Sequence, residues 1–376
     1  MSGGDRPDAP APSTEETGAS GRSGPLGWIG RHRVITAAAV LVLVLAIAGG
    51  SYAYYLNSLL GEVTRLPETT LPEETRPQVN ETGAVTILLA GADNSPGADT
   101  VAESMAADTW PVDEHRSDTI MVLHIPENRK KAYLLSIPRD SYVQIYDETG
   151  EPVGKNKINS AFSTYGPAGY QSTIEHLAGM RMDHLAIVDW AGFKDIVDAL
   201  GGITVYVPET TEPDAKLGDI VFERGNNEMD GETALKYVRS RSTFELQDIG
   251  RIDRQQNFLR AVVRKVSETG MLTSPRSFAQ TFKAIAQNLT VDAEWDNGSL
   301  RSFAWSVRNL KTQDLKAMSA PLDPVEPFPT FEDVGSAVRL DLPALRRLFT
   351  SMKNDDVASY VRAHPELLLP DADEIE

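Results

Sequence analysis

The feature that most constrains this chain is an uninterrupted apolar run at residues 34–55, VITAAAVLVLVLAIAGGSYAYY, which carries no charge. A helix of about 20 apolar residues is long enough to cross a bilayer. Arg31 and Arg33 precede the run, and Glu62 is the first charge after it. Because basic flanks stay in the cytoplasm, we predict a single-pass membrane protein whose C-terminal domain is extracytoplasmic.

The segments around this run divide the rest of the chain. Residues 1–33 are rich in Pro, Gly, Ser and Ala, which predicts a disordered cytoplasmic tail. Residues 56–82 are rich in Pro, Thr and Glu, which predicts an extended stalk. We expect one extracytoplasmic domain over 83–356 and a loose acidic tail over 357–376. A cleaved signal peptide is the alternative to an anchor, since Ala46-Ile47-Ala48 resembles a cleavage site.

Composition excludes several classes of function. The chain of 376 residues has no Cys, which removes disulfides, thiolate metal sites and cysteine nucleophiles. Its net charge of -18 argues against a nucleic-acid binder. The sequence contains no G-x-S-x-G, H-E-x-x-H or P-loop motif.

Apolar runs and amphipathic stretches alternate through the body of the chain. This alternation predicts an α/β fold, a three-layer sandwich with a central mixed β-sheet flanked by helices. The expected strands are Val85–Ala90, Thr119–Ile125, Lys131–Ile137, His184–Asp189 and Ile203–Val207. The expected helices lie near 168–178, 191–200, 231–238, 251–266, 277–287, 297–310 and 342–353, and residues 94–117 are expected to form a long loop.

A basic stretch stands out in this acidic protein. Residues 236–265 hold eight Lys or Arg against three acids. Arg239 and Arg241 form one group, and Arg251, Arg254 and Gln255 share the first turn of the helix expected after it. Guanidinium groups and a helix N-terminus suit an anionic ligand such as phosphate. The alternative is a solvated basic face on an amphipathic helix.

Two carboxylates and two arginines lie at the ends of the first three expected strands, of which Thr119–Ile125 and Lys131–Ile137 are expected to form a hairpin. Asp93 follows the first strand and Asp118 begins the second, and two carboxylates beside phosphates describe a site for Mg²⁺ or Mn²⁺. Arg116 precedes that strand, and Arg139 and Asp140 end its partner. The alternatives are a turn-forming Asp93, a strand-capping Asp118 and ordinary surface ion pairs.

Several motifs, in order, resemble those of the LytR–CpsA–Psr family. They are Arg116-Ser117-Asp118-Thr119, Ser136-Ile137-Pro138-Arg139-Asp140, Lys157-Ile158-Asn159-Ser160-Ala161, VDALGGITVYV at 197–207, Asp230-Gly231-Glu232-Thr233-Ala234-Leu235, Tyr237-Val238-Arg239-Ser240-Arg241 and GRIDRQQ at 250–256. The resemblance spans about residues 84–355. It implies a membrane-anchored, magnesium-dependent phosphotransferase that moves a glycopolymer of teichoic acid, arabinogalactan or capsule type from a polyprenyl-diphosphate carrier to peptidoglycan.

The resemblance also implies roles for single residues. The residues expected to take part in catalysis are Arg139, Arg239, Arg241, Arg251 and Asp118. The residues expected to bind the diphosphate are Arg116, Arg139, Asp140, Arg239, Arg241, Arg251, Arg254 and Gln255. The residues expected to bind the metal ion are Asp93 and Asp118. The chain departs from the family where an Arg usually follows the first Asp, since it reads Asp93-Asn94-Ser95.

Two functions of other kinds are weighed beside the transferase. A polyprenyl-diphosphate hydrolase would use water with the same arginines and metal, and Asp118 and Asp253 are the candidate bases in either reaction. An envelope-anchored binder or regulator would need no catalysis.

Overall fold

The computed structural model describes residues 51, 54–55, 57–67, 71–94, 99–107, 110–213, 218–240, 257–258, 260–262, 264–265 and 275–368. The chain divides into two units, Met1–Tyr55 and Leu56–Glu376, and all elements named below belong to the second. In the described ranges no helix is both long and apolar enough to cross a bilayer. The predicted cytoplasmic tail, and nearly all of the apolar run at 34–55, lie outside the described residues.

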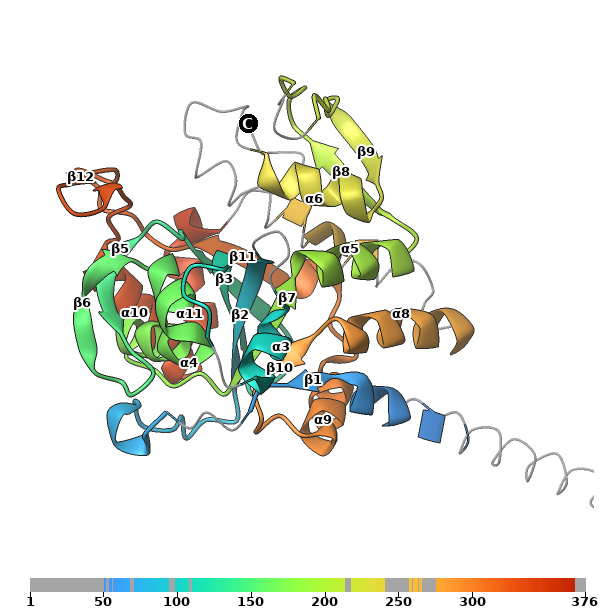
Figure 1. Cartoon of the computed structure of the whole chain (residues 1–376), viewed down its shortest axis with the longest axis horizontal. Helices are drawn as coiled ribbons and strands as arrows, with labels where there is room; N and C mark the ends of the chain where they lie inside the picture. The colour runs from blue at the N-terminus through green and yellow to red at the C-terminus, as the bar shows by residue number, and fades with distance from the viewer. Residues whose placement is uncertain are drawn as a thin grey trace, which may run out of the picture. The chain divides into compact units, whose positions relative to one another are not determined.

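A seven-stranded mixed sheet forms the centre of the second unit (Figure 1). In spatial order its strands are β1 (Thr64–Arg65), β10 (Thr290–Val291), β7 (His184–Asp189), β2 (Val85–Asn94), β3 (His115–Ile125), β4 (Ala132–Ile137) and β11 (Leu315–Ser319). β2 is parallel to β7 and antiparallel to β3, and β4 is antiparallel to β3 and parallel to β11. The carboxyl ends of β2, β4, β7 and β11 therefore meet at one end of the sheet.

Successive side chains of a strand point to opposite faces of the sheet. The central strand β2 has apolar residues on both faces, and helices cover each face. Leu88 packs with the buried sides of α4 (Asn159–Ala178) and α10 (Leu342–Lys353). Ile87 faces the other way and packs with α8 (Pro275–Gln287) and α9 (Asn297–Val307). The predicted layered architecture with a mixed sheet is confirmed.

Smaller elements complete the described fold. The other helices are α3 (Val101–Ala106), α5 (Trp190–Ala199), α6 (Gly231–Arg239) and α11 (Val357–Ala363), with 3-10 turns η1 (Leu60–Glu62), η2 (Glu73–Thr75), η4 (Thr312–Asp314) and η5 (Pro365–Leu367). Three hairpins stand outside the central sheet: β5–β6 (Tyr142–Tyr146, Pro152–Lys157), β8–β9 (Ile203–Val207, Gly225–Met229) and β12–β13 (Thr330–Phe331, Gly335–Ser336). α5, α6 and β8–β9 enclose their own apolar core around Val205 and Tyr237.

Several elements were not expected from the sequence. β6 and β9 both contain Gly and Asn, which are poor strand formers, and pairing with the more apolar strands β5 and β8 makes them extended. The loop expected at 94–117 contains α3, which Thr100 and Glu103 begin with a capping box. α4 starts earlier than predicted and bends at Gly166, whose φ of 65° suits glycine.

The predicted stalk at 56–82 is wrong, because this segment packs against the domain. Leu60 and Val63 are buried in the same core as α8 and α9. β1 pairs with β10, and Arg76 binds the fully buried carboxylate of Glu175 at 2.7 Å. The prediction followed the Pro, Thr and Glu content of the segment and overlooked its leucines, of which Leu59, Leu60, Leu66 and Leu71 are buried in the domain.

The predicted loose tail is also wrong over its first part. Val357 and Val361 of α11 are 0% and 6% exposed and belong to the main core. The acidic residues from 369 onward lie outside the described part of the chain.

A buried histidine gives the fold a pH dependence that is open to measurement. His124 in β3 is 1% exposed, and its Nδ1 lies 2.9 Å from Thr86 Oγ1. Burial lowers the pKa of His124 to about 4. Because the unfolded chain takes up this proton first as the pH falls, the free energy of unfolding should decrease by about 3 kcal/mol between pH ~6.5 and pH ~4.

The His124→Gln variant should lose this part of the slope in urea denaturation measured across that pH range. His364→Gln, a change at an exposed histidine, is the matched control and should keep it. An unchanged slope in His124→Gln would show that other groups cause the acid sensitivity.

Candidate functional site

The predicted carboxylates lie on neighbouring strands at the carboxyl end of β2. Asp93 is directly opposite Arg116 in the register of β2 and β3. Opposite residues in an antiparallel pair share a face, so these two side chains point to the same side of the sheet. Arg116 is exposed, and Asp118 follows it closely along β3.

A β-bulge places Asp118. Gly91 pairs with Thr119 and Ala92 pairs with Ser117, so Asp118 is an extra residue on β3 with no partner on β2. Bulges of this kind redirect a side chain and are frequent beside active sites. The strands approach closely here, since a Cβ on Gly91 would lie 2.9 Å from the Cβ of Thr119. The bulge therefore explains how the side chain of Asp118 stays partly exposed in β3, whose other residues are mostly buried.

Arg139 joins this carboxylate to the end of β4. It donates from Nη1 to Asp118 and from Nε to Asp140 at 3.3 Å. Asp140 in turn lies 3.4 Å from the Nζ of Lys157. The side chains of Arg139 and Asp118 are each 15% exposed, and such partial burial strengthens charge interactions. Two cations and two carboxylates thus alternate along one half-buried chain of contacts.

Lys157 belongs to this cluster because the β5–β6 hairpin returns to the turn after β4. Backbone bonds from Asn159 N to Arg139 O at 3.1 Å and from Ile158 N to Ser141 O at 2.8 Å hold the two segments together. The sequence placed Lys157 in a family motif but assigned it no role. Only the hairpin, which was not predicted, could have indicated its proximity to Asp140.

Arg239 brings a second cation to the same end of the sheet. It is the last residue of α6, which Asp230 caps by accepting from Thr233 N at 2.8 Å. Its Nη2 lies 3.3 Å from Asp93, and its guanidinium stands 5.7 Å from the ring centroid of Trp190. α5 and α6 lie beside each other at this end of the sheet (Figure 1). Trp190, the first residue of α5, is therefore a neighbour of the Arg239 guanidinium.

The environment of Asp93 perturbs its acidity. Burial raises the pKa of Asp93, Arg239 lowers it, and the negative charge of Asp118 raises it again. The indole of Trp190 and the charge of Arg116 also lower it, and the net shift is upward. The Nε1 of Trp190 is buried and has no hydrogen bond within the described residues, so it acts on Asp93 from beyond bonding distance. Asp93 and Asp118 are thus close enough to repel each other.

This pair of carboxylates fits a divalent cation that also binds phosphate. Mg²⁺ in phosphoryl-transfer sites usually takes one or two carboxylates and completes its shell with water and substrate oxygens. The mutual repulsion of Asp93 and Asp118 is what such a cation would relieve. Among the described residues no group of three or more acidic or histidine side chains could hold a metal without substrate.

The structure brings together five of the predicted site residues and leaves others open. The cluster contains Asp93, Asp118, Arg139, Asp140 and Arg239, with Arg116 beside it at the surface. The remaining predicted residues, Arg241, Arg251, Arg254 and Gln255, lie outside the described residues, as does Asp253.

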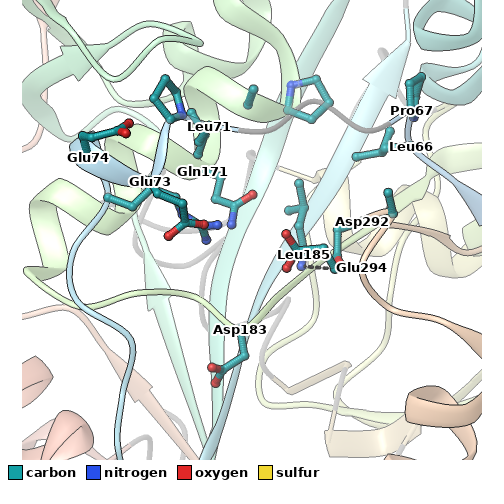
Figure 2. Close-up of a pocket in the computed structure, with 15 residues that line it drawn as sticks. Leu66, Pro67, Leu71, Glu73, Glu74, Gln171, Asp183, Leu185, Asp292 and Glu294 are labelled. Carbon is teal, nitrogen blue, oxygen red and sulfur yellow. Dashed lines mark hydrogen bonds between the residues drawn. The ribbon is translucent and has the colours of Figure 1, made fainter.

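A separate pocket of about 510 Å³ lies at the other end of the sheet (Figure 2). Its lining includes Leu66, Leu71, Asp183, Leu185, Asp292 and Glu294, and none of the predicted site residues. Asp183 precedes β7 and Asp292 follows β10, whereas Asp93 lies beside the carboxyl end of β7. Its acidic lining makes this pocket unsuited to a diphosphate.

Comparisons with known proteins agree with the fold. The LytR_cpsA_psr family model matches residues 59–337. LcpB, a probable cell wall biosynthesis protein of Corynebacterium glutamicum, is 31% identical over 332 residues, which cover 88% of this chain and 72% of that protein. TagU of Oceanobacillus iheyensis, a polyisoprenyl-teichoic acid–peptidoglycan teichoic acid transferase, is 27% identical over 291 residues, or 74% of this chain and 82% of that protein.

Among solved structures, TagV of Bacillus subtilis aligns with a TM-score of 0.56 at 22% identity. The alignment covers 73% of this chain and 97% of that one. At this level of identity the likeness establishes a shared fold.

The electrostatics of Asp93 predict opposite effects of two substitutions. Arg239→Gln removes a cation and should raise the pKa of Asp93 further, whereas Asp118→Asn removes a negative charge and should lower it. Carboxyl ¹³C chemical shifts followed during a pH titration would measure both. Lys236→Gln, which alters a cation on α6 that pairs with Glu232, is the control and should leave the titration of Asp93 in place. Shifts of the same sign in both variants would contradict the assigned contacts.

Proposed function

This chain belongs to the LytR_cpsA_psr family, and we propose that it transfers a glycopolymer from a polyprenyl-diphosphate carrier to peptidoglycan. The family match covers most of the described domain. The relative TagU is a transferase of teichoic acid to peptidoglycan, which supports both the polymer and the acceptor. The polymer is therefore of the class that includes teichoic acid, arabinogalactan and capsule.

One observation carries the proposal: Arg139 and Arg239, which are 100 positions apart, reach the same carboxylate pair from different elements. Arg139 lies just after β4 and Arg239 is the last residue of α6, so they come together only in the folded domain. Guanidinium groups bind phosphate oxygens through paired hydrogen bonds. A diphosphate placed between these two arginines would find charge compensation from both sides.

The chemistry is in-line displacement at phosphorus. A peptidoglycan hydroxyl attacks the polymer-linked phosphorus, the bond to the bridging oxygen breaks, and polyprenyl phosphate leaves. The proton of the hydroxyl passes to a base, for which Asp118 and Asp253 are the candidates. Such reactions depend mainly on positioning and on neutralising the equatorial oxygens. Arg139 and Arg239 supply this neutralisation, and Asp140 orients Arg139 through its Nε bond.

Asp93 and Asp118 are the residues that would hold Mg²⁺ or Mn²⁺ in this scheme. When bound, the ion supplies further positive charge to the diphosphate oxygens. Residues 34–55 would anchor the protein in the membrane where the lipid carrier resides, with the domain on the extracytoplasmic side.

Loss of Arg139 should separate transfer from its alternatives. With lipid-linked oligosaccharide and peptidoglycan, the unmodified protein should form a covalent conjugate, detectable by mass spectrometry after glycan digestion. Arg139→Ala should lower the rate by about 10²- to 10³-fold, the range found when one donor to developing negative charge is removed. Arg139→Lys should also be slow, because an ammonium group lacks the fork that reaches both Asp118 and Asp140.

Arg347→Ala, a change at an exposed arginine of α10, is the matched control and should leave transfer unaffected. Thermal unfolding of each variant checks that the fold is retained. Release of free phosphorylated sugar without conjugate would favour the hydrolase. Retention on cell walls with no turnover of the lipid-linked substrate would favour the binder.

Dependence on a divalent cation is a separate prediction. Chelation with EDTA should abolish transfer, and added Mg²⁺ should restore it. Asp93→Asn removes one carboxylate ligand and should raise the Mg²⁺ concentration that gives half-maximal rate by about tenfold or more, since even residues that only support a metal ligand typically contribute about 10- to 100-fold to metal affinity. Asp195→Asn, on α5 but not among the predicted metal ligands, should not change this concentration. Full activity in EDTA would refute the metal assignment.

A further inference from the structure

The outer face of α9 combines exposed tryptophan and arginine side chains. Its inner face packs Leu300 and Phe303 into the core that it shares with η1 and α8. On the outer side Trp305 is 67% exposed, and Arg301 and Arg308 flank it at helical spacing. Trp is enriched at membrane–water interfaces, and Arg beside it can reach lipid headgroups with its charged end.

The charge of this face is opposite to that of the protein. Residues 297–312 contain Arg301, Arg308 and Lys311 and no acidic residue, although the whole chain carries a net charge of -18. The nearest acids along the chain are Asp296, which caps the start of α9, and Asp314 in η4. Most of a strongly acidic protein is repelled by an anionic surface, so a locally basic face such as that of α9 is a side that such a surface can attract.

Trp305 has one described partner that explains its position without burying it. The Arg308 guanidinium stands 4.0 Å from the indole centroid, and its Nη1 donates to Trp305 O at 2.5 Å. The contact with Arg308 covers part of the ring, but Trp305 remains 67% exposed. A large aromatic side chain at this exposure is costly in water and favourable at a headgroup layer.

α9 contacts the first residues of the domain, which follow the apolar run directly in the sequence. Arg301 Nη1 donates to Asn57 Oδ1 at 2.9 Å, and Leu59 is 4% exposed. Between Tyr55, the last residue of the run, and Leu59 there are only residues 56–58, which span at most about 14 Å even when extended. η1 contacts α9 directly, and the two lie side by side in Figure 1.

We propose that the outer face of α9, formed by Arg301, Ala304, Trp305, Arg308 and Lys311, rests on anionic lipid headgroups. The inference rests on the proposed membrane anchorage of residues 34–55 and adds a second contact that fixes the orientation of the domain. Trp295, just before α9, stacks on His184 at the start of β7 with centroids 4.2 Å apart. The carboxylate and arginine cluster lies at the other end of β7.

The chain has no Cys, so a single introduced cysteine can carry a spin label without background. Ala304→Cys places the label on the outer face and keeps Trp305 and the arginines. The full-length protein would be reconstituted in phosphatidylcholine vesicles with or without phosphatidylglycerol. With phosphatidylglycerol, the label should be protected from a water-soluble nickel relaxant and open to oxygen. A label at Val325→Cys, a site 90% exposed, should stay accessible to nickel.

Charge removal tests the lipid contact directly. Arg308→Gln with Lys311→Gln spares the Arg301–Asn57 bond, and should shift the ratio of docked to undocked domain about 25-fold, roughly fivefold for each cation near an anionic surface. Arg346→Gln with Arg347→Gln, the same charge change on exposed residues of α10, should not shift it.

Three results would overturn the proposal. The first is a label at position 304 that is as accessible to nickel as the label at position 325. The second is protection of the label that survives the Arg308→Gln and Lys311→Gln changes. The third is protection that grows with protein concentration in detergent, which would indicate contact with a second copy of the chain. The measurement needs no transfer substrate, so its failure would leave the proposed reaction standing.

Discussion

The half-buried ion pair between Arg139 and Asp118 connects the end of β4 to the bulge in β3. Each partner alone would be a poorly solvated charge, and together with Asp140 and Lys157 they form a balanced cluster. A diphosphate or a cation that arrives here meets side chains already held in place by their neighbours. Preorganisation of this kind is what catalysis by electrostatic stabilisation requires.

The sequence was informative wherever local pattern decides structure. Continuous apolar runs located β2, β4 and β7, and the expected hairpin correctly placed Asp93 near Asp118. It could not reveal that Asp118 is a bulged residue, because a bulge is a property of the register between two strands. Nor could it reveal the contact between Arg239 and Asp93, which depends on how α6 packs over the end of the sheet.

Composition gave the wrong prediction for two segments whose burial depends on tertiary contacts. Residues 56–82 were predicted to be a stalk because of their Pro, Thr and Glu, yet Leu59, Leu60, Leu66 and Leu71 are buried and Arg76 reaches a fully buried carboxylate. The same error made residues 357–368 a tail, although Val357 and Val361 belong to the core. Short amphipathic segments carry too few apolar residues for a periodic pattern, so their burial is decided by tertiary contacts.

The order of strands in the sheet has a consequence for how the chain matures. β10 covers the edge of β7, and β11 covers the edge of β4, although both come late in the sequence. As synthesis proceeds from the N-terminus, β7 and β4 present open hydrogen-bonding edges until residues 290–319 have emerged. Exposed edges invite pairing with other chains, so both β7 and β4 stay open to such pairing until the last strands of the sheet have been synthesised.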